Sequence, residues 1–169
     1  MNNAQRALHL LPQAVSNMID QLKGYHIDLS TLMLDHACWR CNSTQEYEEM
    51  CHELYEFADI LAKDTIISNR RITTFKLLTP IVIDDIYTID VIEIPDIKVS
   101  STYNSGWEHI EFTAQNLAEF VKKHQNLPFK LKGLKSKHHP CVTLPLKQNQ
   151  NVKFNMCSLQ NQITKEQEN

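Results

Sequence analysis

The stretch "GWEHIEFT", residues 106–113, decides how the chain is interpreted. Its apolar residues, Trp107, Ile110 and Phe112, are types that favour a β-strand. A histidine, His109, nevertheless lies in the middle of the stretch with a glutamate on either side. Titratable groups are costly to bury in a strand unless they are paired or bound. The stretch therefore predicts a strand whose polar side chains serve a site.

An earlier stretch repeats this pattern. "LDHACWR", residues 34–40, has the same order of acidic residue, histidine, apolar residue, any residue, aromatic residue and polar residue. Its histidine, His36, precedes His109 by 73 positions. A helix is predicted behind each strand, so we interpret the pair as an internal repeat.

The rest of the chain supplies the elements of two similar halves. Apolar spacing predicts a helix over residues 3–24, interrupted at Pro12. Ser43, with Glu46 as its capping-box partner, begins a helix whose apolar stripe extends to Leu61. A tight turn is expected at Asn69-Arg70. The remaining expectations are strands over 32–41, 65–68, 72–78 and 86–94, a linker over 95–106, a helix capped by Thr113, strands over 130–135, 141–146 and 151–156, and a frayed tail from Gln160.

The order of these elements predicts the fold class. Each half reads as strand, helix and three strands, which favours an α+β fold of two βαβββ modules forming a curved mixed sheet around a cavity. We divide the chain into a helical N-terminal arm, a domain with two modules, and a polar tail. The boundaries are 1–29 for the arm, 30–158 for the domain with modules 30–95 and 106–158, and 159–169 for the tail.

Composition narrows the classes of function and location. The formal net charge of the 169 residues is −3, and no basic excess indicates nucleic acid as a partner. No apolar run approaches the roughly 20 residues of a membrane-spanning helix. Five cysteines without a regular framework fit a reducing cytoplasm better than a secreted scaffold. We therefore expect a cytoplasmic monomer or homodimer that binds neither nucleic acid nor membrane.

Strand alternation selects the candidate site residues. His36 should share a face with Cys38 and Arg40, and His109 should share one with Trp107, Glu111 and Thr113. If the halves pack as a pseudo-symmetric pair, His36 and His109 meet in one cavity. The last strand of the first half adds Glu93, and Asn155 stands at the comparable place in the second half.

Two imidazoles and a carboxylate are a common ligand set for a divalent first-row metal with open coordination positions. Each residue also has an ordinary structural interpretation. A histidine in a strand can be a satisfied core residue, and Glu93 can be a strand-end carboxylate beside a lysine or arginine. The matched positions of His36 and His109 in the two halves favour the metal interpretation without excluding the structural one.

The pieces "LDHACWRC", "ITTFKL", "IEIP" and above all "GWEHIEF" resemble the YecM family, within the vicinal oxygen chelate (glyoxalase/extradiol dioxygenase) superfamily. The resemblance covers roughly residues 30–158 together with a helical N-terminal arm. It implies a single site built by two modules, with His36, Glu93 and His109 as ligands of a divalent metal such as Zn, Fe, Mn or Ni. Where the family carries a histidine, this chain has Asn155, so Asn155 or His139 completes the site, or the fourth position is filled by water.

The resemblance implies a metal-dependent enzyme related to isomerases, lyases and dioxygenases, acting on a small oxygen-rich molecule. Glu111, which flanks the site, is the candidate general base. The alternative is a protein of the same fold that binds a metal or small ligand without turnover. A purely structural role without metal is a third possibility.

Other candidates are weaker. Cys38 and Cys41 have the C-x-x-C spacing of zinc and redox sites, but their positions in a strand should direct them to opposite faces. Arg40, Arg71 and Lys76 could orient an anionic substrate or could be solvated charges at the rim.

Overall fold

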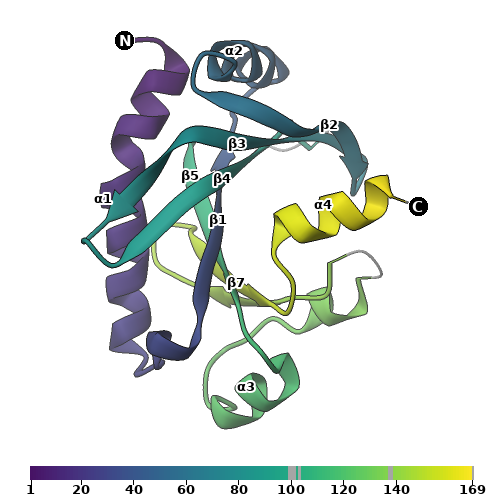
Figure 1. Cartoon of the computed structure of the whole chain (residues 1–169). Helices are drawn as coiled ribbons and strands as arrows, with labels where there is room; N and C mark the ends of the chain where they lie inside the picture. The colour runs from purple at the N-terminus through teal and green to yellow at the C-terminus, as the bar shows by residue number, and fades with distance from the viewer. Residues whose placement is uncertain (99–101, 103, 137–138, 169) are drawn as a thin grey trace.

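The computed structural model describes all residues except 99–101, 103, 137, 138 and 169. Part of the predicted 95–106 linker therefore lies outside the described residues. The described chain forms four α-helices and one seven-stranded mixed sheet, which confirms the α+β class with a curved sheet and an N-terminal helix (Figure 1). The elements, in chain order, are α1 (Asn3–Gly24), β1 (Met33–Arg40), α2 (Thr44–Leu54), β2 (Ala58–Ile67), β3 (Arg70–Ile83), β4 (Tyr87–Pro95), β5 (Gly106–Thr113), α3 (Leu117–Lys123), β6 (Val142–Pro145), β7 (Asn151–Asn155) and α4 (Leu159–Gln167).

The first helix, α1, is continuous, so the predicted interruption at Pro12 is wrong. Asn2 and Gln5 form a capping box at its start. A stripe of buried residues runs along both sides of the proline, and its packing against the sheet outweighs the one backbone hydrogen bond that proline cannot donate. The stripe consists of Ala4, Ala7, Leu11, Val15, Met18, Ile19 and Leu22.

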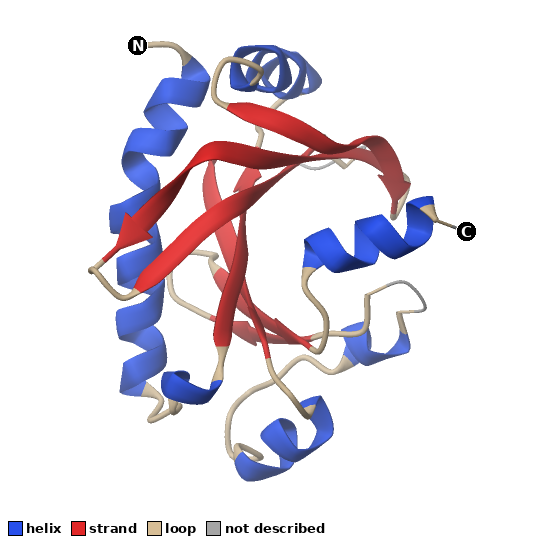
Figure 2. Cartoon of the chain, in the orientation of Figure 1, coloured by secondary structure: helices blue, strands red, loops and turns tan. Residues whose placement is uncertain are grey.

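The sheet has the strand order β2-β3-β4-β1-β5-β7-β6. The central pair, β1 and β5, is antiparallel and joins the two halves, while β1–β4 and β5–β7 are parallel. Figure 2 shows the sheet curving around an open side, with α1 outside the curve and α4 across the opening. The two strands that carry the repeated histidines therefore lie next to each other at the centre.

The second half is less regular than predicted. Residues 130–135 do not form a strand: Lys130 makes an isolated bridge with Thr143, and Lys132–Lys135 form a single 3₁₀ turn. Gly133 explains part of this, because a Cβ there would lie 2.5 Å from the carbonyl oxygen of Cys141. Only glycine permits such a close approach of the two backbones.

Several predicted boundaries shift. The helix α2 begins after its cap at Ser43 as predicted but ends at Leu54. Of the remaining residues of the expected helical stripe, Phe57 lies in a turn, and Ala58 and Leu61 belong to β2. The turn between β2 and β3 is Ser68-Asn69, where both residues have positive φ, rather than Asn69-Arg70. Asn116, not Thr113, caps α3. The predicted frayed tail instead forms α4, which Ser158 caps.

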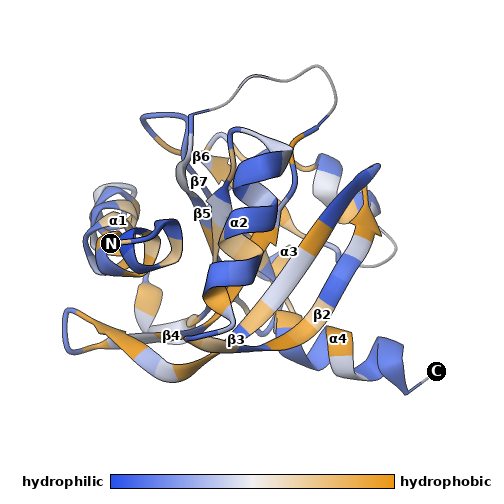
Figure 3. Cartoon of the chain, turned by 90° about the horizontal axis from the view of Figure 1, so that it is seen from above, coloured by the Kyte–Doolittle hydropathy of each residue, from blue (hydrophilic) through white to orange (hydrophobic). Residues whose placement is uncertain are grey.

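The hydrophobic core lies between the sheet and α1, and α2 and α3 add Tyr47, Met50, Leu54 and Leu117 to it. In Figure 3 most of the hydrophobic colour lies on the strands, and the outward side of α1 is largely hydrophilic. Trp107 of β5 donates a hydrogen bond of 2.9 Å from its indole nitrogen to the carbonyl of Ala7, and its ring packs edge-on against Trp39 at 5.4 Å. These contacts fix α1 on the face opposite to the cavity. Among the described residues, no helix is long and apolar enough to cross a membrane.

Candidate metal centre

Two β-bulges position the repeated acid–histidine pairs. The register between β1 and β5 shifts once between Leu34 and His36, and again where Trp39 pairs with Trp107. In the first shift Asp35 is the extra residue, and in the second it is Glu108. A bulge breaks strict alternation. Trp107 therefore points towards α1 instead of sharing the cavity face with His109, which corrects the sequence prediction.

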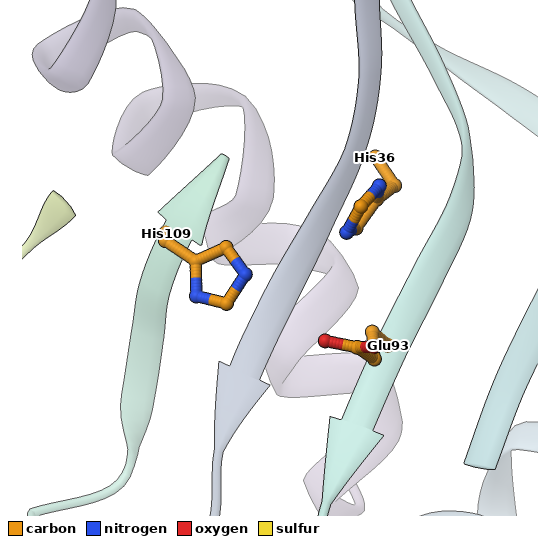
Figure 4. A group of neighbouring side chains, drawn as sticks. All are labelled: His36, Glu93 and His109. Atoms are coloured by element: carbon orange, nitrogen blue, oxygen red, sulfur yellow. The ribbon is translucent and has the colours of Figure 1, made fainter. Parts of the chain in front are cut away.

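The structure brings three of the predicted residues together. Nitrogen atoms of His36 and His109 and a carboxylate oxygen of Glu93 all lie within 4.8 Å of one another. The two imidazole rings approach edge to face, with 6.2 Å between their centroids. Figure 4 shows both rings and the carboxylate converging from β1, β5 and β4.

His36 is oriented as a ligand would be. Its Nδ1 lies 2.8 Å from Oδ2 of Asp35, while its Nε2 is buried and has no hydrogen-bond partner among the described residues. Burial alone would lower the pKa of His36, but the negative charges of Glu111 and Asp35 outweigh it and raise that pKa. A carboxylate holding one ring nitrogen and leaving the other bare is the usual support for a metal-bound histidine. The unpartnered Nε2 of His36 and its support by Asp35 therefore fit the binding of a divalent metal.

A lysine lies against the same cluster. The ammonium nitrogen of Lys153 is 2.9 Å from Nε2 of His109 and 2.9 Å from Oε1 of Glu111. Burial alone would lower the pKa of Lys153, but Glu111 and Glu93 hold it above its ordinary value. Burial and the charge of Lys153 together lower the pKa of His109. A metal that used Nε2 of His109 would have to displace this ammonium.

The register of the sheet identifies Lys153 as the counterpart of Glu93. Cys38, two residues after His36, pairs with Glu93 on the parallel neighbour β4. Glu111, two residues after His109, pairs in the same way with Lys153 on the parallel neighbour β7. The sequence prediction had placed Asn155 at this position, and the register corrects it by two residues.

Glu111 is the centre of the polar network around the site. Its Oε2 accepts hydrogen bonds from the side-chain amide of Asn155 at 2.9 Å and from Nε2 of His139 at 2.8 Å. Oε1 lies 3.4 Å from Nε2 of His109 and 3.6 Å from Nε2 of His36. Burial alone would raise the pKa of Glu111, but Lys153 and His36 hold it well below its ordinary range. The carboxylate of Glu111 is therefore ionised, and His139, Lys153 and Asn155 all donate hydrogen bonds to it.

The two residues that the sequence left open for a fourth position, Asn155 and His139, both contact Glu111 rather than the cluster. His139 also bonds to Gln162 of α4 through its Nδ1. Burial alone would lower the pKa of His139, but Glu111 raises it. Both residues thus lie one contact away from the three potential ligands.

The site opens into a cavity of about 490 Å³ on the concave side of the sheet. Glu93, Lys153 and His139 line one end of it, and Ile67, Arg70 and Ile72 line the wall formed by the β2–β3 hairpin. Leu159, Gln162 and Ile163 of α4 close it from outside. The helix is attached by polar contacts, among them a hydrogen bond of 2.9 Å from the backbone N–H of Leu159 to Oδ2 of Asp35.

A second group of possible ligands shares His109. Cys38, Glu108 and His109 offer atoms within 4.8 Å of one another. Burial raises the pKa of the Cys38 thiol well above its ordinary value, so the sulfur is protonated in the metal-free protein. Among the described residues, no such group contains both Cys38 and Cys41.

The other predicted cations lie in ion pairs. Arg71 binds Asp96 and Glu48, Lys76 binds Asp90, and Arg40 binds Glu108. A larger polar hollow of about 1030 Å³ lies between α1, α2 and the start of β5, and Arg40 and Glu108 line it. Sequence reasoning missed Arg70 and Lys153. The sequence offered no separate signal for Lys153, because its pairing with Glu111 depends on the register of β5 against β7.

Comparison with solved structures defines the class of fold. Methylmalonyl-CoA epimerase of Streptomyces coelicolor, solved with 2-nitronate-propionyl-CoA, superimposes with a TM-score of 0.53 at 12% identity over 75% of this chain and 97% of that one. The structure titled Structural Genomics, Protein EC4020 superimposes with a TM-score of 0.73 at 20% identity, covering 97% of this chain and 89% of that chain. The chain therefore shares its fold with methylmalonyl-CoA epimerase.

The sequence defines the family more closely. Residues 3–166 match the profile of the YecM protein family, so the chain belongs to that family. An uncharacterized protein of Haemophilus influenzae is 35% identical over 89 residues. The match spans 53% of this chain and 46% of that protein.

Proposed function

We propose that the protein is a divalent-metal-dependent enzyme of the vicinal oxygen chelate type, acting on a small oxygen-rich molecule by isomerase-, lyase- or oxygenase-like chemistry. The observation that carries the proposal is the bare, buried Nε2 of His36, held by Asp35 and directed at Glu93 and His109. A buried polar atom without a partner is costly, and a metal ion removes that cost. Modules 30–95 and 106–158 would each contribute one histidine.

His36, Glu93 and His109 are the proposed ligands. A divalent ion bound there would supply Lewis-acid stabilisation of charge on substrate oxygens. Glu111 remains the proposed proton-transfer residue, now as a pair with His139, whose Nε2 it contacts. The low pKa of Glu111 makes it a weak base on its own, so His139, with its raised pKa, is the better partner for an exchanging proton.

One observation favours the alternative of ligand binding without turnover. Lys153 places a protein cation against His109 and Glu111, at the register position where the first half has a carboxylate. A built-in cation can hold the acidic groups in place without a metal. In that case the protein would bind an oxygen-rich ligand through Lys153 and would not catalyse a reaction.

Metal uptake tests the proposal. Protein made without a polyhistidine tag is reconstituted with Zn, Mn, Ni or Fe(II), desalted and weighed by native mass spectrometry. We expect about one ion per chain in the wild type and none in His36→Ala. His9→Ala, which alters a histidine on the exposed side of α1, is the matched control and should keep the ion. Wild-type protein that takes up none of the four metals would exclude the metal-dependent function.

A further inference from the structure

Arg70 is a half-buried cation whose hydrogen-bonding capacity is largely unused. It begins β3 and lines the cavity together with Ile72. Its Nε is buried and has no hydrogen-bond partner among the described residues, and its Nη1 makes one long bond of 3.5 Å to the carbonyl of Asp96. A guanidinium offers five N–H donors in a planar fork. The structure therefore leaves most of this fork available to a ligand.

Two other cations that line the cavity differ from Arg70 because they are paired, and a third, Lys63, is exposed to solvent. Lys153 and His139 both contact Glu111 at hydrogen-bond distance. Arg71, the next residue along β3, points to the other side and binds Asp96 and Glu48. Within the described residues, Arg70 has no carboxylate at ion-pair distance. A half-buried charge without a counterion favours binding of an anion.

The position of Arg70 fixes where that anion would lie. Thr74, four residues along β3, pairs with Glu93 of the candidate metal centre. The Asp96 carbonyl, which Arg70 contacts, lies three residues beyond Glu93, directly after β4 ends at Pro95. At about 3.3 Å per strand residue, the guanidinium and the level of Glu93 are separated by roughly 10 Å. A chain of about five carbons could reach from one to the other.

We propose that the cavity recognises a small dicarboxylate-like anion, with vicinal oxygens at the candidate metal centre and a distal carboxylate on the fork of Arg70. This inference rests on the proposed function, because it assigns a substrate class to the same site. Carboxylate geometry matches a planar guanidinium in bidentate fashion, which a lysine cannot reproduce. Ile72 lies on the wall between the two ends, and Ile67 lies beside Arg70, so the lining suits a short apolar linker.

A matched pair of ligands tests the inference. 2-Oxoglutarate and 2-oxopentanoate carry the same vicinal oxygens and differ only in the distal carboxylate. Each is titrated calorimetrically into metal-loaded, desalted wild type, Arg70→Met and Arg70→Lys. We expect the wild type to prefer 2-oxoglutarate by roughly tenfold or more, in line with a charge-assisted hydrogen bond. Arg70→Met should lose that preference without weakening 2-oxopentanoate, and Arg70→Lys should retain part of it.

Controls separate this inference from the proposed function. Arg6→Met removes an exposed positive charge from α1 and should leave the preference unchanged. Equal preference in wild type and Arg70→Met, or no binding of either ligand to metal-loaded wild type, would overturn the recognition by Arg70 while leaving the metal site intact.

If the chain takes up no metal, glutarate and pentanoate are compared on the metal-free protein. A preference for glutarate that depends on Arg70 would then support the anion site alone. Inorganic phosphate that displaces 2-oxoglutarate better than acetate does would reject a carboxylate in favour of a phosphoryl group.

Discussion

The ammonium of Lys153 lies 2.9 Å from Nε2 of His109, the ring nitrogen that faces His36 and Glu93. The lone pair that a metal would need is thus already engaged by a protein cation. Oε1 of Glu111 accepts a hydrogen bond of 2.9 Å from the same ammonium and lies 3.4 Å from Nε2 of His109. Metal binding and retraction of Lys153 should therefore be coupled.

We expect Lys153→Met to bind a divalent ion roughly tenfold or more tightly than the wild type, because it removes a positive charge from the site and frees Nε2 of His109. Competition titration against a chelator of known affinity measures the change. Lys147→Met, at an exposed position, should have no effect. Weaker metal binding in Lys153→Met would show that the lysine supports the ion rather than competing with it.

Asp35→Asn should weaken metal binding by about 10–100-fold while leaving the ligands themselves in place, because Asp35 orients His36 and increases its basicity. The same chelator competition gives the affinity. His36→Ala, measured alongside, should remove binding almost entirely. Equal losses in the two variants would indicate that Asp35 is itself a ligand or that its loss unfolds the site.

Metal affinity should rise with pH. A protonated imidazole cannot bind a metal, and the pKa of His36 is raised in the metal-free protein by Glu111 and Asp35 despite its burial. Protons therefore compete up to a higher pH than for an ordinary histidine of pKa about 6.5. Isothermal titration between pH 5.5 and 8.5 should place the midpoint of the affinity change above 6.5, and Asp35→Asn should move it lower. A midpoint well below 6.5 in the wild type would contradict the assignment of His36.

Trp107→Phe should lower the free energy of unfolding by about 1–3 kcal/mol, because it removes the buried hydrogen bond to Ala7 and part of the packing against Trp39. Urea unfolding followed by circular dichroism measures this. Trp39→Phe loses part of the same packing but only a longer hydrogen bond of 3.4 Å to Glu46, so it should cost less. Metal affinity should change little in either variant, since both indoles lie away from the cavity.

The sequence predicted the fold well where local patterns and the repeat agreed. The acid–histidine order of His36 and His109 identified the two central strands, and the structure places them side by side. The sequence-based prediction failed where the pairing of the strands, rather than the pattern within one strand, decides which way a side chain points. The extra residues Asp35 and Glu108 depend on the register of β1 against β5, which one strand alone does not reveal.

The same limit explains the error at Asn155. Counting from strand ends suggested Asn155 as the counterpart of Glu93, whereas the parallel pairing of β5 with β7 selects Lys153.

The C-terminal helix α4 was missed for a different reason. It contains no buried residue and depends on its cap and on tertiary bonds such as that of Leu159 to Asp35. Arg70 was missed because the sequence does not show which of the two neighbouring arginines lines the cavity, whereas in the structure Arg70 does and Arg71 pairs with Asp96 and Glu48.

The helix α4 covers the cavity, yet it is held mainly by polar contacts at Leu159, Gln160, Gln162 and Gln167. Such contacts exchange readily with water, so this helix should open far more often than the sheet beneath it unfolds. The residence time of a bound molecule would then be set by the undocking of a nine-residue segment. A chain ending at Ser158 should release its ligand faster while melting at a similar temperature, which stopped-flow displacement and calorimetry can measure.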